Sequence, residues 1–100
     1  MHPPQANINF ERIYVTVQGK VQGVGFRVAV RSEAIKLGIS GCVWNNQDAS
    51  VGIIAEGSSG TIKIFVGWLK KGPSGAFVTQ IAIKADPYKG NFSSFTIELV

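Results

Sequence analysis

The sequence predicts an α+β sandwich, an antiparallel sheet with two helices on one of its faces. Three observations lead to this fold class. One stretch near the start alternates between apolar and polar residues, two segments carry apolar residues at helical spacing, and short strand-like runs lie between and after them. The chain has 100 residues, of which 45% are hydrophobic and only 16% charged. These values fit one compact domain with a single core rather than a disordered chain.

The first strand and the first helix have the clearest patterns. Apolar residues occupy every second position over residues 13–18, which is typical of a half-buried strand. Residues 26–37 carry apolar side chains at helical spacing, namely Phe26, Val30, Ala34 and Leu37. Gly38 is placed to end this helix, because glycine readily adopts the left-handed conformation of a helix C-terminus. Phe26 is expected to anchor the helix to the core.

Two strands and a second helix follow. We expect strands from Val43 to about Asn46 and over residues 51–55, joined by a turn at residues 47–49. A short break at residues 57–60 precedes a helix over residues 61–70. The buried face of that helix is expected to contain Ile62, Phe65 and Leu69.

The C-terminal part completes the pattern. Gly72-Pro73 ends the second helix, because proline disfavours helical geometry in the residue before it. Strands are expected over residues 77–83 and 95–99, with a loop at residues 86–90. The order β-α-β-β-α-β is the ferredoxin-like plan, with the last run as an additional short strand or as part of a split fourth strand.

The ends and the cysteine content bound the class of protein. Residues 1–9 read as a flexible N-terminal lead-in to a domain over residues 10–100, and no secretory signal is expected. No apolar run approaches the roughly 18 residues that span a bilayer. Cys42 is the only cysteine, so an intramolecular disulfide is impossible and a reducing, cytoplasmic location is favoured. With a single His2 besides, no metal site is expected.

The formal charge of +4 favours an anionic partner. The ten lysines and arginines are scattered along the chain, and only Lys70-Lys71 are adjacent. Attraction to a small anion is therefore preferred to binding of nucleic acid.

A glycine-rich loop is the most informative segment. Gly19, Gly23 and Gly25 lie between the first strand and the first helix, and Arg27 follows in the first helical turn. Glycine lets backbone N–H groups converge on one point, and a helix N-terminus adds unpaired N–H groups. Arginine supplies a planar cationic fork that matches phosphate oxygens. The loop predicts a cradle for one tetrahedral dianion, although a tight β-to-α turn would use the same glycines.

Two runs give this loop a family resemblance. Residues 21–27 resemble the signature of the acylphosphatase family, in the order Val21, Gln22, Gly23, Val24, Gly25, Phe26 and Arg27. A second family pattern, a glycine followed by a spaced asparagine, is matched from Gly41 to Asn45. The resemblance covers roughly residues 12–99. It implies hydrolysis of small acyl phosphates to a carboxylate and inorganic phosphate, which is product and inhibitor, by a monomer without metal or cofactor.

The resemblance also implies site residues. Arg27 and the backbone N–H groups of residues 21–27 are expected to bind the phosphoryl group, and Asn45 to orient the attacking water. The chemistry agrees, because an acyl phosphate has a good carboxylate leaving group and needs mainly positioning and charge stabilisation. No obvious carboxylate base accompanies the loop, so the phosphate itself is a candidate acceptor of the water's proton.

Four positions depart from the family pattern. Trp44 replaces a common basic residue and Cys42 a usual aromatic one, which indicates that bulk has moved along one face of the strand. Substrate preference around the site is therefore open. Ala49 stands where a hairpin glycine is usual, at a cost of about 1 kcal/mol if that position needs φ > 0. Gly52 replaces a common glutamate, for which a local effect on stability is expected.

Two other functions remain open at this level. The ferredoxin-like plan and the positive charge also suit a nucleic-acid-binding module, although the stacking aromatic motif of RNA-recognition sheets is absent. A module that binds an acyl phosphate without turnover would use the same loop. Hydrolysis of an acyl phosphate without metal would distinguish an acylphosphatase from both binding modules.

Overall fold

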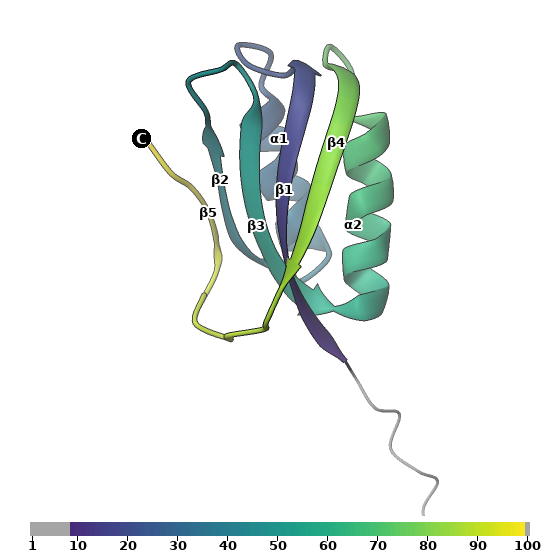
Figure 1. The fold of residues 1–100 in the computed structure, drawn as a ribbon, viewed down its shortest axis with the longest axis vertical. Coiled ribbons are helices and arrows are strands. Elements are labelled where there is room, and N and C mark those ends of the chain that lie inside the picture. Colours follow the sequence, from purple (N-terminus) through teal and green to yellow (C-terminus); the bar gives the residue numbers. More distant parts are fainter. Residues whose placement is uncertain (1–8, 100) are drawn as a thin grey trace, which may run out of the picture.

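The computed structural model describes residues 9–99 as a five-stranded sheet with two helices on one face (Figure 1). The elements in chain order are β1 (Phe10–Lys20), α1 (Phe26–Lys36), β2 (Ser40–Asn45), β3 (Val51–Ser58), α2 (Ser59–Lys71), β4 (Phe77–Asp86) and β5 (Phe95–Ile97). The ferredoxin-like α+β fold is therefore confirmed. The lead-in expected at residues 1–9 lies, apart from Asn9, outside the described residues.

The sheet has the strand order β4-β1-β3-β2-β5. The first four strands of that order pair antiparallel, as expected. β5 pairs parallel with β2, so the sheet is mixed rather than antiparallel throughout. β5 is a separate strand at the edge opposite β4, and not a split part of the fourth strand. The connection over residues 87–94 consequently crosses the sheet.

The core lies between the sheet and the helices. Ile13, Val15 and Val17 are buried on the helix-facing side of β1, as their alternation predicts. The helical faces predicted for both helices are buried as well, with Phe26, Val30 and Ala34 from α1 and Ile62, Phe65 and Leu69 from α2. The Phe65 ring meets the Phe95 ring edge to face at 6.3 Å, which ties α2 to β5.

Some element boundaries differ from the prediction. β2 begins at Ser40 rather than Val43, and β4 runs on to Asp86. The break expected at residues 57–60 is wrong, because β3 continues to Ser58 and α2 begins at the next residue. The Ser58 side chain caps α2 by accepting a hydrogen bond from the Thr61 N–H at 3.4 Å. A serine cap lets the chain pass from strand to helix without a loop.

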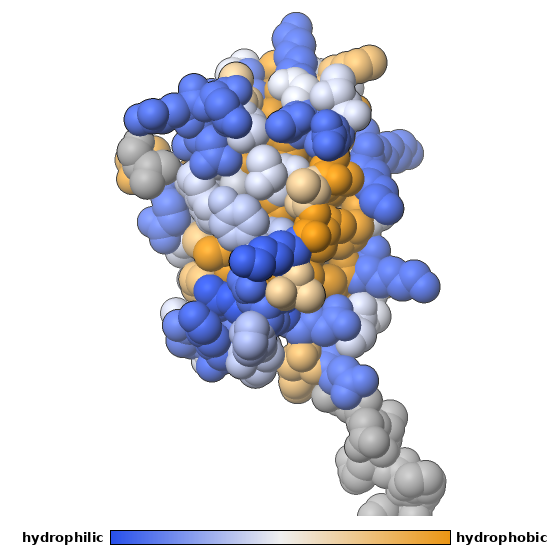
Figure 2. Space-filling model, in the orientation of Figure 1, coloured by the Kyte–Doolittle hydropathy of each residue, from blue (hydrophilic) through white to orange (hydrophobic). Residues whose placement is uncertain are grey.

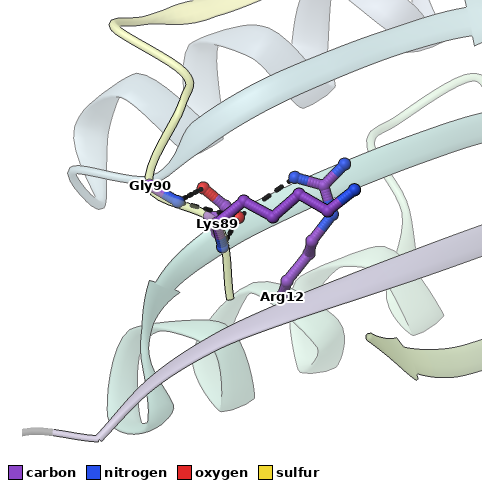
Figure 3. A network of polar contacts seen from close by, with 4 residues as sticks. Arg12, Lys89 and Gly90 are labelled. Carbon is purple, nitrogen blue, oxygen red and sulfur yellow. Dashed lines mark hydrogen bonds and ion pairs between the residues drawn. The ribbon is translucent and has the colours of Figure 1, made fainter. Parts of the chain in front are cut away.

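The other sheet face carries the alternate residues of each strand, and neither of the two helices formed by residues 9–99 covers it. Apolar residues gather in the middle of this face and hydrophilic residues border them (Figure 2). Towards the start of β1, the Arg12 guanidinium donates to the Glu56 carboxylate at 3.0 Å. The same carboxylate accepts from the Lys89 and Gly90 N–H groups at 2.9 and 3.2 Å (Figure 3). These contacts fasten the crossing segment to the sheet.

Candidate active site

The N-terminus of α1 carries no acceptor for its free N–H groups. Gly25 is the N-cap residue, with φ of 76°, and no side chain among residues 9–99 caps the helix. The first turn contains no acidic residue either. α2, in contrast, has its serine cap. Since the first N–H groups of any helix lack partners within it, α1 presents donors and the positive end of its dipole to a ligand.

The glycine loop adds further donors and has fixed ends. Gly23 and Gly25 have φ of 74° and 76°, a left-handed conformation that side chains disfavour. Within residues 9–99, none of the N–H groups from Gln22 to Arg27 has a hydrogen-bond partner. Val21 and Phe26 are both 1% exposed, so buried side chains hold the loop at each end. The loop is therefore anchored while its donors remain available.

Arg27 lies in the first turn of α1, directly beyond this loop, and is partly exposed. In the described part of the chain, the one salt bridge is that of Arg12 with Glu56, so Arg27 is not neutralised by a carboxylate. A cation at a helix N-terminus is unfavourable to the helix. An anion bound at this end of the helix would contact both the arginine and the free N–H groups.

Gln22 ties the loop to the hairpin between β2 and β3. Its side-chain amide donates to the Asn46 and Ser50 carbonyl oxygens, both at 2.9 Å. The loop follows the end of β1 and the hairpin follows the end of β2, and both lie at the same end of the sheet (Figure 1). The Gln22 amide thus places the loop next to the residue that follows Asn45.

Asn45 is the last residue of β2 and pairs with Val51 of β3. It lies on the same side of the strand as buried Val43, which is the helix-facing side. Its side-chain oxygen is buried, and no group within residues 9–99 donates to it. Buried polar atoms nearly always have a partner, so this oxygen is poised to accept a hydrogen bond from water or a ligand.

One carboxylate stands in the hairpin beside the loop. Asp48 accepts hydrogen bonds from the Ser50 hydroxyl and the Ser50 N–H. These bonds hold the pKa of the Asp48 carboxyl below its usual value, the hydroxyl being the larger cause. Asp48 is therefore a poor proton acceptor at neutral pH. Ala49, the next residue, has φ of 75°, which confirms that this hairpin position demands the left-handed conformation.

The departures at Trp44 and Gly52 belong together. The two residues are directly opposite in the β2–β3 ladder, and a Cβ built on Gly52 would lie 2.4 Å from Cε2 of the Trp44 indole. Gly52 therefore provides the space that the indole occupies, which is more specific than the expected local effect on stability. Cys42 shares this face and is buried, which raises the pKa of its thiol. It has the properties of a small packed residue rather than a nucleophile.

The described residues offer neither a metal-binding cluster nor a membrane-spanning helix. No three His, Cys, Asp or Glu side chains gather into a possible metal site within the part of the chain described. No helix between residues 9 and 99 is long and apolar enough to cross a bilayer.

Comparison with known proteins decides the family. A family model described as Acylphosphatase matches residues 13–97. The chain belongs to the acylphosphatase family. It is 38% identical over 95 residues to an acylphosphatase of Aeropyrum pernix, covering 94% of each chain. It is 48% identical over 85 residues to one of Actinobacillus succinogenes, covering 83% of this chain and 92% of the relative. A solved acylphosphatase from Coxiella burnetii superposes with a TM-score of 0.86 and 35% identity, over 96% of this chain and 100% of that one.

The structure of this acylphosphatase-family chain brings together the site residues expected from its sequence. The segment from Val21 to Arg27 and Asn45 occur at one end of the sheet. Sequence reasoning missed two contributions at this end. The Gln22 side chain joins the loop to the hairpin, although only its backbone was considered, and Trp44 reaches the hairpin through an Asn46 hydrogen bond of 2.8 Å. The unusual pairing of a bulky Trp44 with Gly52 was the available signal.

Proposed function

We propose that this chain hydrolyses the carboxyl–phosphate bond of small acyl phosphates, with Arg27 and the N–H groups of residues 21–27 binding the phosphoryl group and Asn45 orienting water. One juxtaposition carries the proposal. An uncapped helix N-terminus with an unpaired arginine lies at the same sheet end as a buried, unpartnered amide oxygen. The first arrangement suits a phosphoryl dianion and the second suits a water molecule.

The reaction follows from these two parts. The loop N–H groups hold the phosphoryl oxygens, and Arg27 stabilises the charge that develops on them in the transition state. The Asn45 side-chain oxygen accepts a hydrogen bond from water and directs a lone pair of the water oxygen towards phosphorus. A bond forms between that oxygen and phosphorus while the bond from phosphorus to the carboxyl oxygen breaks. The carboxylate leaves with the electron pair of the broken bond.

One of the water's two protons passes to a phosphoryl oxygen, and the other stays on the oxygen that has bonded to phosphorus. Asp48 is the carboxylate of the adjoining hairpin, and its lowered pKa makes it a weak base. A carboxylate leaving group needs no acid catalyst, so the site requires neither a protein base nor a protein acid. The products are a carboxylate and inorganic phosphate, which competes for the same N–H groups.

The oligomeric state and the cellular location of the chain are also proposals. The loop, Arg27 and Asn45 all come from one chain, so a monomer suffices for the reaction. A single buried cysteine, Cys42, fits a reducing cytoplasm. Neither metal, cofactor, membrane nor nucleic acid has a role in the proposed chemistry.

The first test is turnover without metal. The purified chain in excess chelator should hydrolyse benzoyl phosphate and acetyl phosphate, with inorganic phosphate as a competitive inhibitor. Glycerol phosphate is the matched control substrate and should be inert, because its alkoxide leaving group needs an acid that the site lacks. Binding of phosphate without turnover would favour a binding module instead. Salt-dependent retention of RNA without turnover would favour the nucleic-acid alternative.

Asn45→Ala should separate the water's role from that of phosphate. We expect kcat to fall about 10²-fold to 10³-fold, the scale of one preorganised polar group, with KM nearly unchanged. The free energy of unfolding should not decrease, because the lost oxygen has no partner to leave unsatisfied within the described residues. Steady-state kinetics and urea unfolding measure the two quantities. Asn91→Ala, at an exposed position, is the control. A kcat within twofold of the parent would contradict the role of Asn45.

A further inference from the structure

The Trp44 side chain is held by contacts that have no role in the proposed reaction. Its indole lies against Gly52 of the opposite strand, so closely that any larger residue at position 52 would displace it. The Tyr14 ring of β1 contacts it across β3, with ring centres 5.7 Å apart and planes tilted by 60°. The contacts with Gly52 and Tyr14 hold the indole in one orientation over the end of β2.

This orientation points the indole N–H at the hairpin. The Trp44 Nε1–H donates to the Asn46 side-chain oxygen at 2.8 Å, while the Asn46 side-chain nitrogen donates to the Ser50 hydroxyl at 3.0 Å. An indole can only donate, so the amide must present its oxygen to Trp44 and its nitrogen to Ser50. Both ends of the Asn46 amide are therefore determined by the tryptophan on one side and the serine on the other.

Asn46 and Ser50 also form the hydrogen bonds that hold the phosphate loop. Asn46 and Ser50 supply the two carbonyl oxygens that accept from the Gln22 amide, and the Asn46 N–H donates to the Ser50 carbonyl at 2.9 Å. A shift of the Asn46 backbone would thus move the acceptors that hold Gln22. Gln22 is itself part of the phosphate loop, so a continuous set of contacts leads from Trp44 to the loop.

We infer that Trp44 is a positioning residue for the phosphate loop, acting through Asn46 and Gln22 rather than by touching substrate. Trp44 and Asn45 are consecutive in β2, and their side chains leave the sheet on opposite faces. The indole is therefore placed to set the hairpin without entering the space beside Asn45. The inference deepens the proposed function and rests on it for the identity of the bound anion.

This role has a kinetic signature. Loop N–H groups hold the phosphoryl group in both the ground state and the transition state, so a displaced loop weakens both equally. Such a change raises KM while kcat is preserved. Inorganic phosphate uses the same donors, and its Kd should rise by the same factor as KM.

The test compares Trp44→Phe with the parent chain. The substitution keeps an aromatic ring and removes only the N–H donor and part of the ring. We expect KM for benzoyl phosphate and the calorimetric Kd of inorganic phosphate to rise together, by about threefold to tenfold, the scale of one neutral hydrogen bond. The kcat should stay within twofold. Unchanged KM and Kd in a folded variant would overturn the inference, whatever its thermal stability.

Asn46→Ala tests the proposed route independently of the indole's bulk. It should raise KM and Kd by a similar factor, and the double variant should be no worse than either single one, because both changes interrupt one path. Additive effects would overturn the route through Asn46. Trp68→Phe, at the only other tryptophan of the chain, is the matched control and should change neither quantity. All measurements are made at a temperature where circular dichroism shows each variant folded.

Calorimetry keeps the two proposals distinguishable. If the parent binds phosphate and hydrolyses no acyl phosphate, the proposed function fails, while the effect of Trp44→Phe on the phosphate Kd still decides the inference. If the parent turns over substrate and Trp44→Phe changes neither KM nor Kd, the inference alone fails.

Discussion

Arg27→Gln should lower kcat/KM for benzoyl phosphate by about 10³-fold or more, the range measured when a phosphoryl-transfer site loses its arginine. The reason is electrostatic. Glutamine keeps a polar chain of similar reach but removes the one cation that the structure places at the N-terminus of α1 without a carboxylate partner. The remaining loop N–H groups would still bind some phosphate, so the Kd of inorganic phosphate should rise without binding being abolished.

Two further variants test whether the effect depends on the charge and the planar shape of the Arg27 side chain. Arg27→Lys keeps the charge and loses the planar fork, so its kcat/KM should fall between those of the parent and Arg27→Gln. Arg31→Gln removes an exposed charge one turn further along the same helix and should have little effect. An Arg27→Gln variant with parental kcat/KM would remove the basis of the proposed site.

Stability should move in the opposite direction to activity. A cation in the first turn of a helix opposes the helix dipole, and removing it is worth about 0.3–1 kcal/mol at low ionic strength. Arg27→Gln is therefore expected to leave the free energy of unfolding unchanged or slightly raised in urea titrations. Loss of both stability and activity would instead indicate that Arg27 supports the fold.

The sequence predicted the helix-facing core well, for a physical reason. A strand that is buried on one face has apolar residues with period 2, and a helix has them with period 3.6. The burial of Val15 and of Phe65 can therefore be predicted from the sequence pattern around each residue. Pairing partners are not encoded in that way. β5 is too short for a pattern, and its parallel pairing with β2 depends on where the segment over residues 87–94 is fastened. The boundary at Ser58 was not predictable either. A loop was expected there, but the Ser58 side chain caps α2 and the helix follows the strand directly.

The site was predictable as far as its motif residues extend. Arg27 and Asn45 were expected from the two family patterns, and the structure places both at one end of the sheet. The contacts that join them depend on residues distant in sequence. Gln22 meets carbonyl oxygens of the β2–β3 hairpin, and the Trp44 indole fits only because position 52 has no side chain. Such complementarity is a property of pairs, and nothing in the sequence indicated that Trp44 and Gly52, which both depart from the family pattern, lie against one another.

Glu56 is the clearest residue that sequence reasoning could not interpret. A glutamate in a strand usually faces solvent, yet this one is 1% exposed. Its carboxylate is compensated by the Arg12 guanidinium and by the Lys89 and Gly90 N–H groups (Figure 3). The Phe92 ring covers that guanidinium, with 5.3 Å from the Arg12 Cζ to the ring centre. One buried charge thus organises the segment that carries the chain from β4 to β5.

Glu56→Gln should consequently destabilise the fold far more than an ordinary surface change. The variant is nearly isosteric but leaves the Arg12 charge buried without a counter-ion, and breaking a buried pair in this way costs about 3–5 kcal/mol. For a domain of this size, each kcal/mol corresponds to roughly 4–8 °C in Tm, so calorimetry should show a large shift. Glu11→Gln, at the exposed neighbour of Arg12, is the matched control and should stay within about 0.5 kcal/mol.

The kinetic result of Glu56→Gln distinguishes a structural role from a catalytic one. Arg12 and Glu56 lie towards the start of β1 and the end of β3, whereas the phosphate loop follows the far end of β1. At a temperature where the variant is folded, kcat and KM should therefore match the parent. Replacing both partners together, as in Arg12→Met with Glu56→Leu, should recover much of the lost stability, because no unpaired charge remains. A double variant as unstable as Glu56→Gln would show that the N–H groups of Lys89 and Gly90, rather than the ion pair, depend on the carboxylate.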